Sequence, residues 1–311
     1  MDYSAAVDYI RKYDDFLLVT HINPDGDTLG SAAALCSALR RAGKTAWLFD
    51  TPDVPDKYTG YVNKYIAPEG YAFKKVISVD VASESLIPEG MDAEVDLVVD
   101  HHPGNSFKTE NKLARPRYSS CGEIVYRLIL KLCDNVTDEE ALLLYIAIST
   151  DTGCFQYANT NYNPLETVSR LYKQDINTAE VNRKLFRKVS TARIKLEGMI
   201  YSGMRYYRDG RISVAIITRQ MLEECGATTD DLDDIATLAC RPEGVSLGIT
   251  IREREDGKCK VSMRSFDGIN SREICSVFGG GGHEAAAGCT ISASPEMACE
   301  MLISVIDEVL K

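Results

Sequence analysis

Apolar positions in the first half of the chain alternate between short, strand-like runs and longer helical ones. The predicted strands are "FLLVTH" at 16–21, "TAWLFD" at 45–50, "FKKVISVD" at 73–80 and "VDLVVDHH" at 95–102. Residues 28–43 read as a helix that ends at a glycine. Strands that alternate with helices are typical of an α/β domain, so we expect a parallel sheet with helices on both faces.

Two more helices follow in the sequence. "TDEEALLLYIAISTDTG" begins at Thr137, and Glu140 three residues later completes the pattern of a capping box. "SSCGEIVYRLI" is predicted to begin a helix with Ser119 or Ser120 as its cap. From 177 to 204 the sequence is basic and helical without a strand, which indicates a connector.

The pattern beyond the connector changes to paired strands. "YYRDGRISVAII" at 206–217 and "VSLGITIREREDGKCKVSMRS" at 245–265 are typical of β-hairpins. Helical patterns follow near 270–278 and 295–310. We therefore expect a smaller α/β domain with a mixed sheet, and divide the chain into 1–176, the connector 177–204, and 205–311.

Composition narrows the class of protein. The 311 residues are 45% hydrophobic and 26% charged, as in soluble globular chains, and the sequence starts without a signal-peptide pattern. No apolar run approaches the ~20 residues that span a bilayer. The ten cysteines form no CxxC pair, which favours a reducing, cytoplasmic location over a disulfide framework. We expect no membrane partner.

The net charge of −11 argues against a broad grip on duplex DNA, which needs a basic surface. The net charge does not exclude binding of a short or small phosphorylated ligand, because bound divalent cations reverse the local field of a carboxylate-rich site.

Metal-binding residue types gather where the predicted strands end. In parallel sheets these ends meet at one edge, so His21, Asp80 and His101 are expected close together. Each acidic residue alone has an ordinary explanation, as a turn or a helix cap. Together the chain offers two imidazoles and four carboxylates, His21, His101, Asp25, Asp27, Asp80 and Asp151. Such a set suits two divalent cations, Mn²⁺ first, with Mg²⁺, Co²⁺ or Zn²⁺ as alternatives.

The same stretches resemble the four signature motifs of the DHH phosphoesterases, in the expected order. They are "HINPDGDTLGS", "SVDVAS", "VVDHHPGN" and "ISTDTGCF", and the resemblance covers about residues 15–175. It implies a dinuclear, usually manganese, centre in which a metal-activated water hydrolyses a phosphoester. One metal would be held by His21, Asp25 and Asp80, and the other by Asp27, Asp80, His101 and Asp151, with Asp80 as the bridge. His102 would face the substrate, and Asp100 would support the ligands from behind.

The second half carries a candidate anion site. "FGGGGHEAAAG" at 278–288 contains four consecutive glycines, whose backbone N–H groups can surround an anion. The alanines that follow predict a helix packed beneath. The stretch resembles the closing motif of the DHH-associated C-terminal domain. That resemblance implies substrate contacts from Arg264, Ser265, Gly280, Gly281, Gly282 and His283. The alternatives are a surface linker and an exposed strand arginine.

The chain as a whole resembles the stand-alone, bifunctional nano-RNases. This resemblance implies hydrolysis of very short oligoribonucleotides to mononucleotides and of 3′-phosphoadenosine 5′-phosphate to AMP. Residues 1–176 would be the catalytic domain and 205–311 the substrate-binding domain. A phosphodiesterase for cyclic di-AMP or linear dinucleotides stays open, as does a metal-dependent nucleotide sensor without turnover. The sequence leaves the native metal and a homodimer undecided.

Overall fold

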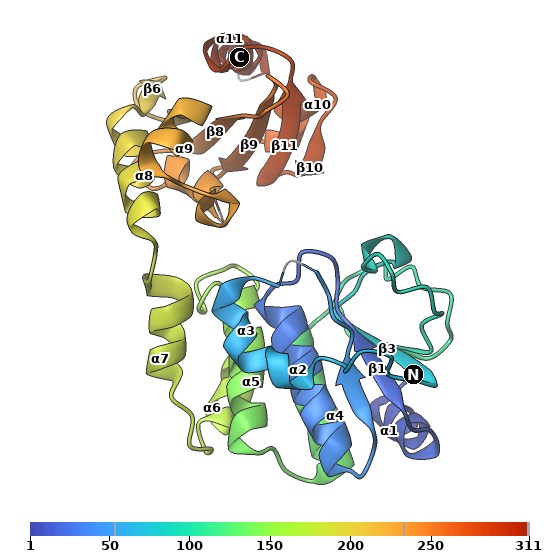
Figure 1. Ribbon diagram of the computed structural model, residues 1–311. Helices are drawn as coiled ribbons and strands as arrows, with labels where there is room; N and C mark the ends of the chain where they lie inside the picture. Colours follow the sequence, from blue (N-terminus) through green and yellow to red (C-terminus); the bar gives the residue numbers. More distant parts are fainter. Residues whose placement is uncertain (53, 233, 310–311) are drawn as a thin grey trace. The chain divides into compact units, whose positions relative to one another are not determined.

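The computed structural model describes residues 1–52, 54–232 and 234–309, in two compact units (Figure 1). The units are Met1–Lys188 and Val189–Lys311. Their boundary lies inside the predicted connector. Helix α7 (Thr178–Asn182) and the π-helical turn η3 (Arg183–Arg187) belong to the first unit, and α8 (Thr191–Ser202) to the second.

A parallel sheet of five strands, in the order β2-β1-β3-β4-β5, forms the centre of the first unit. The strands are β1 (Phe16–Val19), β2 (Ala46–Leu48), β3 (Lys75–Val79), β4 (Leu97–Asp100) and β5 (Lys112–Ala114). The first four lie within the predicted runs, which confirms the parallel α/β fold. The edge strand β5 was not predicted, because three residues with one buried side chain carry no readable alternation.

Helices cover one face of this sheet. They are α1 (Tyr3–Lys12), α2 (Gly26–Arg41), α3 (Asp56–Val62), α4 (Cys121–Cys133), α5 (Asp138–Asp151) and α6 (Tyr162–Leu171), with the short turn η1 (Asn63–Tyr65). The predicted capping box of Thr137 and Glu140 begins α5. Figure 1 shows α2, α4 and α5 side by side, and glycine permits this closeness. A Cβ on Gly30 of α2 would lie 2.5 Å from the carbonyl oxygen of Leu143 in α5.

The other face of the sheet differs from the prediction of helices on both sides. Leu17, Val19 and Val76 pack there against Met91 and neighbouring loop residues. Within the described residues, the covering segments are loops with the single turn η2 (Glu84–Leu86). The connection from β3 to β4 contains Pro88 and Gly90, which do not favour a longer helix.

The second unit is built on a mixed sheet in the order β10-β11-β9-β8-β7-β6. Its strands are β6 (Arg205–Tyr207), β7 (Ile212–Ile217), β8 (Leu247–Glu253), β9 (Cys259–Ser265), β10 (Gly281–His283) and β11 (Ala286–Ile291). Only β7 and β8 pair in parallel, and both predicted hairpins are confirmed.

Helices lie on both faces of this second sheet. Besides α8, they are α9 (Arg219–Cys225), α10 (Ser271–Ser276), α11 (Pro295–Val309) and the turns η4 (Thr229–Leu232) and η5 (Ile235–Cys240). The last residue of the predicted helix 295–310 lies outside the described residues. Across the described ranges, no helix is long and apolar enough to cross a membrane.

The alanine stretch after the glycine run forms a strand, so the predicted helix is wrong. Ala287 of β11 pairs with Gly282 of β10 on one side and Met263 of β9 on the other. A Cβ on Gly282 would lie 2.5 Å from the carbonyl oxygen of Ala286, so glycine allows the tight hairpin. Pairing on both sides outweighs the intrinsic helix preference of alanine.

Candidate metal centre

The turn between β1 and α2 brings His21 and Asp25 together. Asp25 is the N-cap of α2, and its Oδ1 accepts hydrogen bonds from the amides of Asp27 (3.0 Å) and Thr28 (3.1 Å). The Nε2 atom of His21 lies 3.7 Å from Oδ1 of Asp25 and 3.9 Å from Oδ2 of Asp80. Burial opposes a charge on His21, but Asp25, the carbonyl oxygen of Ile22 and Asp80 together outweigh it and raise the pKa of His21 to about 9.

Asp27 is buried and links two helices. Its Oδ2 accepts a hydrogen bond from the amide of Cys121 (2.7 Å), and its Oδ1 accepts one from the amide of Gly122 (3.0 Å). These amides begin α4, whose N-cap Ser120 makes no side-chain capping bond. Ser120 is thus the N-cap residue, as predicted, but the carboxylate of Asp27 and not the serine hydroxyl accepts the hydrogen bonds of these first amides. Burial and then the nearby Asp80 raise the pKa of Asp27 well above its usual range.

Asp80 stands between two histidines at the end of β3. Its backbone φ of +60° is unusual for a residue other than glycine, and its amide donates to the carbonyl oxygen of Val99 (2.9 Å). Oδ2 faces His21, whereas Oδ1 lies 3.4 Å from Nε2 of His101. Oδ1 is buried and has no hydrogen-bond partner in the structure. A buried carboxylate oxygen that faces imidazole nitrogens without a hydrogen bond fits the role of a metal ligand.

His101 completes the cluster on the side of Asp27. Its Nε2 lies 3.8 Å from Oδ2 of Asp27 and 3.6 Å from Oδ2 of Asp151, the last residue of α5. Its Nδ1 lies 3.3 Å from the carbonyl oxygen of Tyr118, which leaves Nε2 turned to the carboxylates. Burial raises the pKa of Asp151 to about 6.

His102 lies at the edge of this cluster, where Asp100 holds its ring. Oδ1 of the buried Asp100 lies 2.9 Å from Nδ1 of His102, closer than the 3.5 Å to Oδ1 of Asp80. The other oxygen of Asp100 accepts a hydrogen bond from Nδ2 of Asn105 (2.7 Å), which also donates to the carbonyl oxygen of Val81 (2.9 Å). This series of hydrogen bonds occupies Nδ1 of the half-exposed His102 and leaves its Nε2 available. Asn105 was missed by sequence reasoning, although it stands in the motif "VVDHHPGN".

The side chains form three overlapping groups that suit divalent cations. Donor atoms of His21, Asp25 and Asp80 lie within 4.8 Å of one another, as do those of Asp27, His101 and Asp151. A third group joins Asp80 to His101 and His102, so the first two groups are linked through Asp80 and His101. Carboxylate and imidazole donors are typical ligands of Mn²⁺ and related ions. The raised pKa values of Asp27 and Asp80 reflect buried carboxylates that a cation would neutralise.

The second unit gathers most of its predicted substrate residues around one hollow of about 700 Å³. Arg264 on β9 lines it together with Gly280, Gly281 and Gly282. His283 is exposed at the end of β10. Sequence reasoning missed Lys260, which also lines the hollow. The period of two along a strand places Lys260 on the same face as Arg264, and that signal could have found it.

Ser265 does not join this hollow. The residue is buried, and its hydroxyl donates to the carbonyl oxygens of Ile269 (2.6 Å) and Glu284 (3.1 Å). It also lies 2.8 Å from the hydroxyl of Ser271. As the strand alternates, Ser265 faces the opposite side from Arg264, so the structure assigns it to the interior.

Comparison with known proteins agrees with these two units. Residues 15–148 match the DHH family, N-terminal domain, and residues 212–311 match the DHHA1 domain. The bifunctional oligoribonuclease and PAP phosphatase NrnA of Thermus thermophilus is 31% identical over 303 residues, covering 94% of this chain and 89% of that protein. Its namesake in Bacillus subtilis is 27% identical over 292 residues, covering 91% of each.

A solved structure shares the fold. The exopolyphosphatase-related protein of Bacteroides fragilis superimposes with a TM-score of 0.86 at 22% identity, covering 98% of this chain and 95% of its own. The paired domains and the similarity to NrnA proteins lead to one assignment: the chain belongs to the DHH family of phosphoesterases.

Proposed function

We propose that this protein hydrolyses very short oligoribonucleotides to mononucleotides and converts 3′-phosphoadenosine 5′-phosphate to AMP. The observation that carries the proposal is Asp80, whose two oxygens face His21 on one side and His101 on the other. A carboxylate so placed suits the bridge of a dinuclear phosphoesterase centre. The names of the two relatives supply the substrate classes.

The proposed ligands divide between the two cations. His21 and Asp25 hold one ion, Asp27, His101 and Asp151 hold the other, and Asp80 serves both. Mn²⁺ is the proposed ion, with Mg²⁺ or Co²⁺ as substitutes. Bound cations would supply a nucleophile from water near neutral pH and offset the charge that develops on the phosphate.

His102 is the proposed catalytic side chain beside the cations. Its Nδ1 is occupied by Asp100, which fixes the ring and leaves Nε2 for the substrate. An imidazole held in this way can donate a hydrogen bond to a phosphate oxygen or a proton to the leaving oxygen. The exposed edge of His102 gives a substrate access to that atom.

We propose that Arg264 and the glycine run bind a terminal phosphate of the substrate. The guanidinium group presents parallel donors that match phosphate oxygens, and Gly280 to Gly282 line the same hollow without side chains that would obstruct a ligand. His283 adds a donor at the same hairpin. A cytoplasmic location, where such nucleotides are found, is part of the proposal.

A substrate panel with Mn²⁺ tests the proposal. The purified protein would be incubated with a diribonucleotide, 3′-phosphoadenosine 5′-phosphate, cyclic di-AMP and pyrophosphate, and the products separated by chromatography. We expect release of mononucleotides and AMP from the first two. Preferential hydrolysis of cyclic di-AMP or pyrophosphate would reassign the substrate, and binding without turnover would make the protein a sensor.

A further inference from the structure

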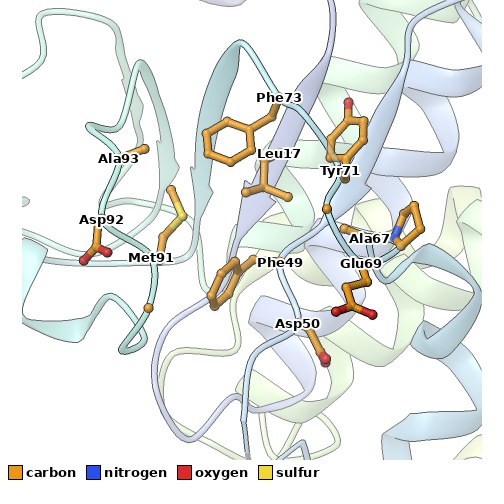
Figure 2. A pocket seen from close by; sticks show the side chains of 13 residues that line it. Leu17, Phe49, Asp50, Ala67, Glu69, Tyr71, Phe73, Met91, Asp92 and Ala93 are labelled. Carbon is orange, nitrogen blue, oxygen red and sulfur yellow. The ribbon is translucent and has the colours of Figure 1, made fainter.

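A cavity of about 800 Å³ lies on the face of the first sheet that helices do not cover (Figure 2). Thirteen residues line it, and none belongs to the metal-ligand groups. They come from β1, from the segment after β2, and from the loops before β3 and β4. The volume is in the range of pockets that hold small molecules.

The floor and walls of this cavity are apolar and largely aromatic. Figure 2 shows Leu17, Phe49, Phe73 and Met91 around a common space, with Tyr71 on the right. Leu17 and Met91 are nearly buried, but 37% of Phe73 is exposed. Phe49 and Tyr71 are half-buried, and an apolar hollow bordered by aromatic rings is characteristic of a surface that accepts a ligand.

Three carboxylates surround the apolar floor. Asp50 and Glu69 lie at the lower right of Figure 2, and Asp92 lies on the opposite side. All three are exposed, and within the described residues none makes a hydrogen bond or ion pair through its side chain. The thirteen lining residues include no lysine, arginine or histidine.

Lysines in the same unit pair with other carboxylates. Lys74 bonds Asp15 at 2.6 Å, and Lys75 bonds Asp96 at 2.6 Å. Other carboxylates of this unit are therefore neutralised by lysine ion pairs, but the three carboxylates at the cavity have no such pair within the described residues. The cavity thus combines an apolar, aromatic floor with unbalanced negative charge.

We propose that this cavity binds a small organic cation, an ammonium, amidinium or guanidinium group on an apolar body. The charged group would donate charge-assisted hydrogen bonds to the carboxylates of Asp50 and Glu69 on one side of the cavity, while Asp92 adds negative charge on the opposite side. The body would lie on Phe49 and Phe73, whose ring faces attract cations. The same carboxylates repel phosphates, so the cavity is not a second site for the nucleotide substrate.

Matched aromatic probes test this site. The full chain, with its metal centre loaded with Mg²⁺, would be titrated with p-aminobenzamidine, the neutral p-aminobenzamide and the anionic p-aminobenzoate. Binding would be followed by equilibrium dialysis. Because a hydrogen bond to a charged group contributes about 1.5–3 kcal/mol, we expect the cation to bind at least about tenfold more tightly than either analogue.

Variants locate the binding. The double variant Glu69→Gln, Asp50→Asn should lower the affinity for the cation by about tenfold or more. Phe73→Ala should lower the affinity for all three probes. Glu110→Gln, an exposed carboxylate outside the cavity, is the matched control and should change nothing. Diribonucleotide hydrolysis should be unchanged in each variant, which reports an intact fold. Equal affinity for the three probes, no saturable binding, or unchanged affinity in the double variant would each overturn the proposal.

Discussion

At the scale of single residues, Asp80 shows most clearly how the fold prepares a metal site. The side chain is buried, Oδ1 makes no hydrogen bond within the described residues and faces His101 and His102, and the backbone adopts a left-handed conformation. Each of these features costs free energy in the absence of a cation. The position of Asp80 at a strand end could be predicted from sequence. Its left-handed backbone and the lack of a hydrogen bond to Oδ1 depend on the residues packed around it, and these could not be predicted.

Asp80→Asn tests the bridge. Asparagine tolerates the left-handed backbone and keeps the side-chain volume, so the change removes charge with little strain. We expect fewer than two cations per chain by metal analysis. Hydrolysis should fall by more than the roughly 10–100-fold that loss of an outer-sphere partner costs. Asp8→Asn, at an exposed site on α1, is the control. Two bound cations with full activity would show that Asp80 is not the bridge.

Asn105→Ala tests the hydrogen-bonded chain behind His102. Without the amide, Asp100 loses a partner and His102 its fixed orientation. We expect kcat on a diribonucleotide to fall by roughly 10–100-fold while the number of bound cations stays the same. Asn63→Ala, an exposed asparagine, serves as the control. A variant that keeps its kcat would remove Asn105 from the account.

At the scale of elements, the local sequence pattern predicted the strands and their ends. It did not predict features that depend on contacts between segments far apart in the sequence. The valine-rich strands β3 and β4 and their terminal aspartates were readable from alternation and strand ends. The cap that Asp27 provides to α4 joins residues 94 apart in the sequence. The hairpin of β10 and β11 likewise depends on pairing with β9. Such partners leave no signal in local periodicity.

Gly30→Ala tests the close packing of α2 on α5. The added methyl group would lie 2.5 Å from a backbone oxygen of α5, which cannot move independently of its helix. We expect a loss of about 1–3 kcal/mol in the free energy of unfolding, measured with urea. Gly198→Ala in α8 meets nothing within 4 Å and should stabilise its helix by up to about 1 kcal/mol. Equal effects of the two changes would contradict this packing.

At the scale of the whole molecule, the proposed metal chemistry belongs to the first unit and the proposed phosphate recognition to the second. The division agrees with the separate DHH and DHHA1 matches and with the separate hydrophobic cores of the two units. With a net charge of −11, the proposed function requires bound cations and a few basic side chains, such as Arg264, to offset the charge of a phosphorylated substrate.

Arg264→Ala tests the role of the second unit. Because a hydrogen bond to a charged group contributes about 1.5–3 kcal/mol, KM for a diribonucleotide should rise roughly 10–100-fold. Metal content should stay unchanged, since Arg264 is not among the ligands. Arg272→Ala, an exposed arginine on α10, controls for loss of charge. An unaltered KM would exclude Arg264 from substrate binding.

The dependence of hydrolysis on substrate length tests the central claim most directly. With Mn²⁺, the wild-type protein would be given a diribonucleotide, a pentaribonucleotide and a long single-stranded RNA at equal concentrations, and kcat/KM measured for each. We predict efficient, metal-dependent hydrolysis of the dinucleotide and a steep fall with length, because an acidic chain has no extended grip on a polyanion. Equal turnover of all three substrates, or dinucleotide hydrolysis that persists in EDTA, would contradict the account.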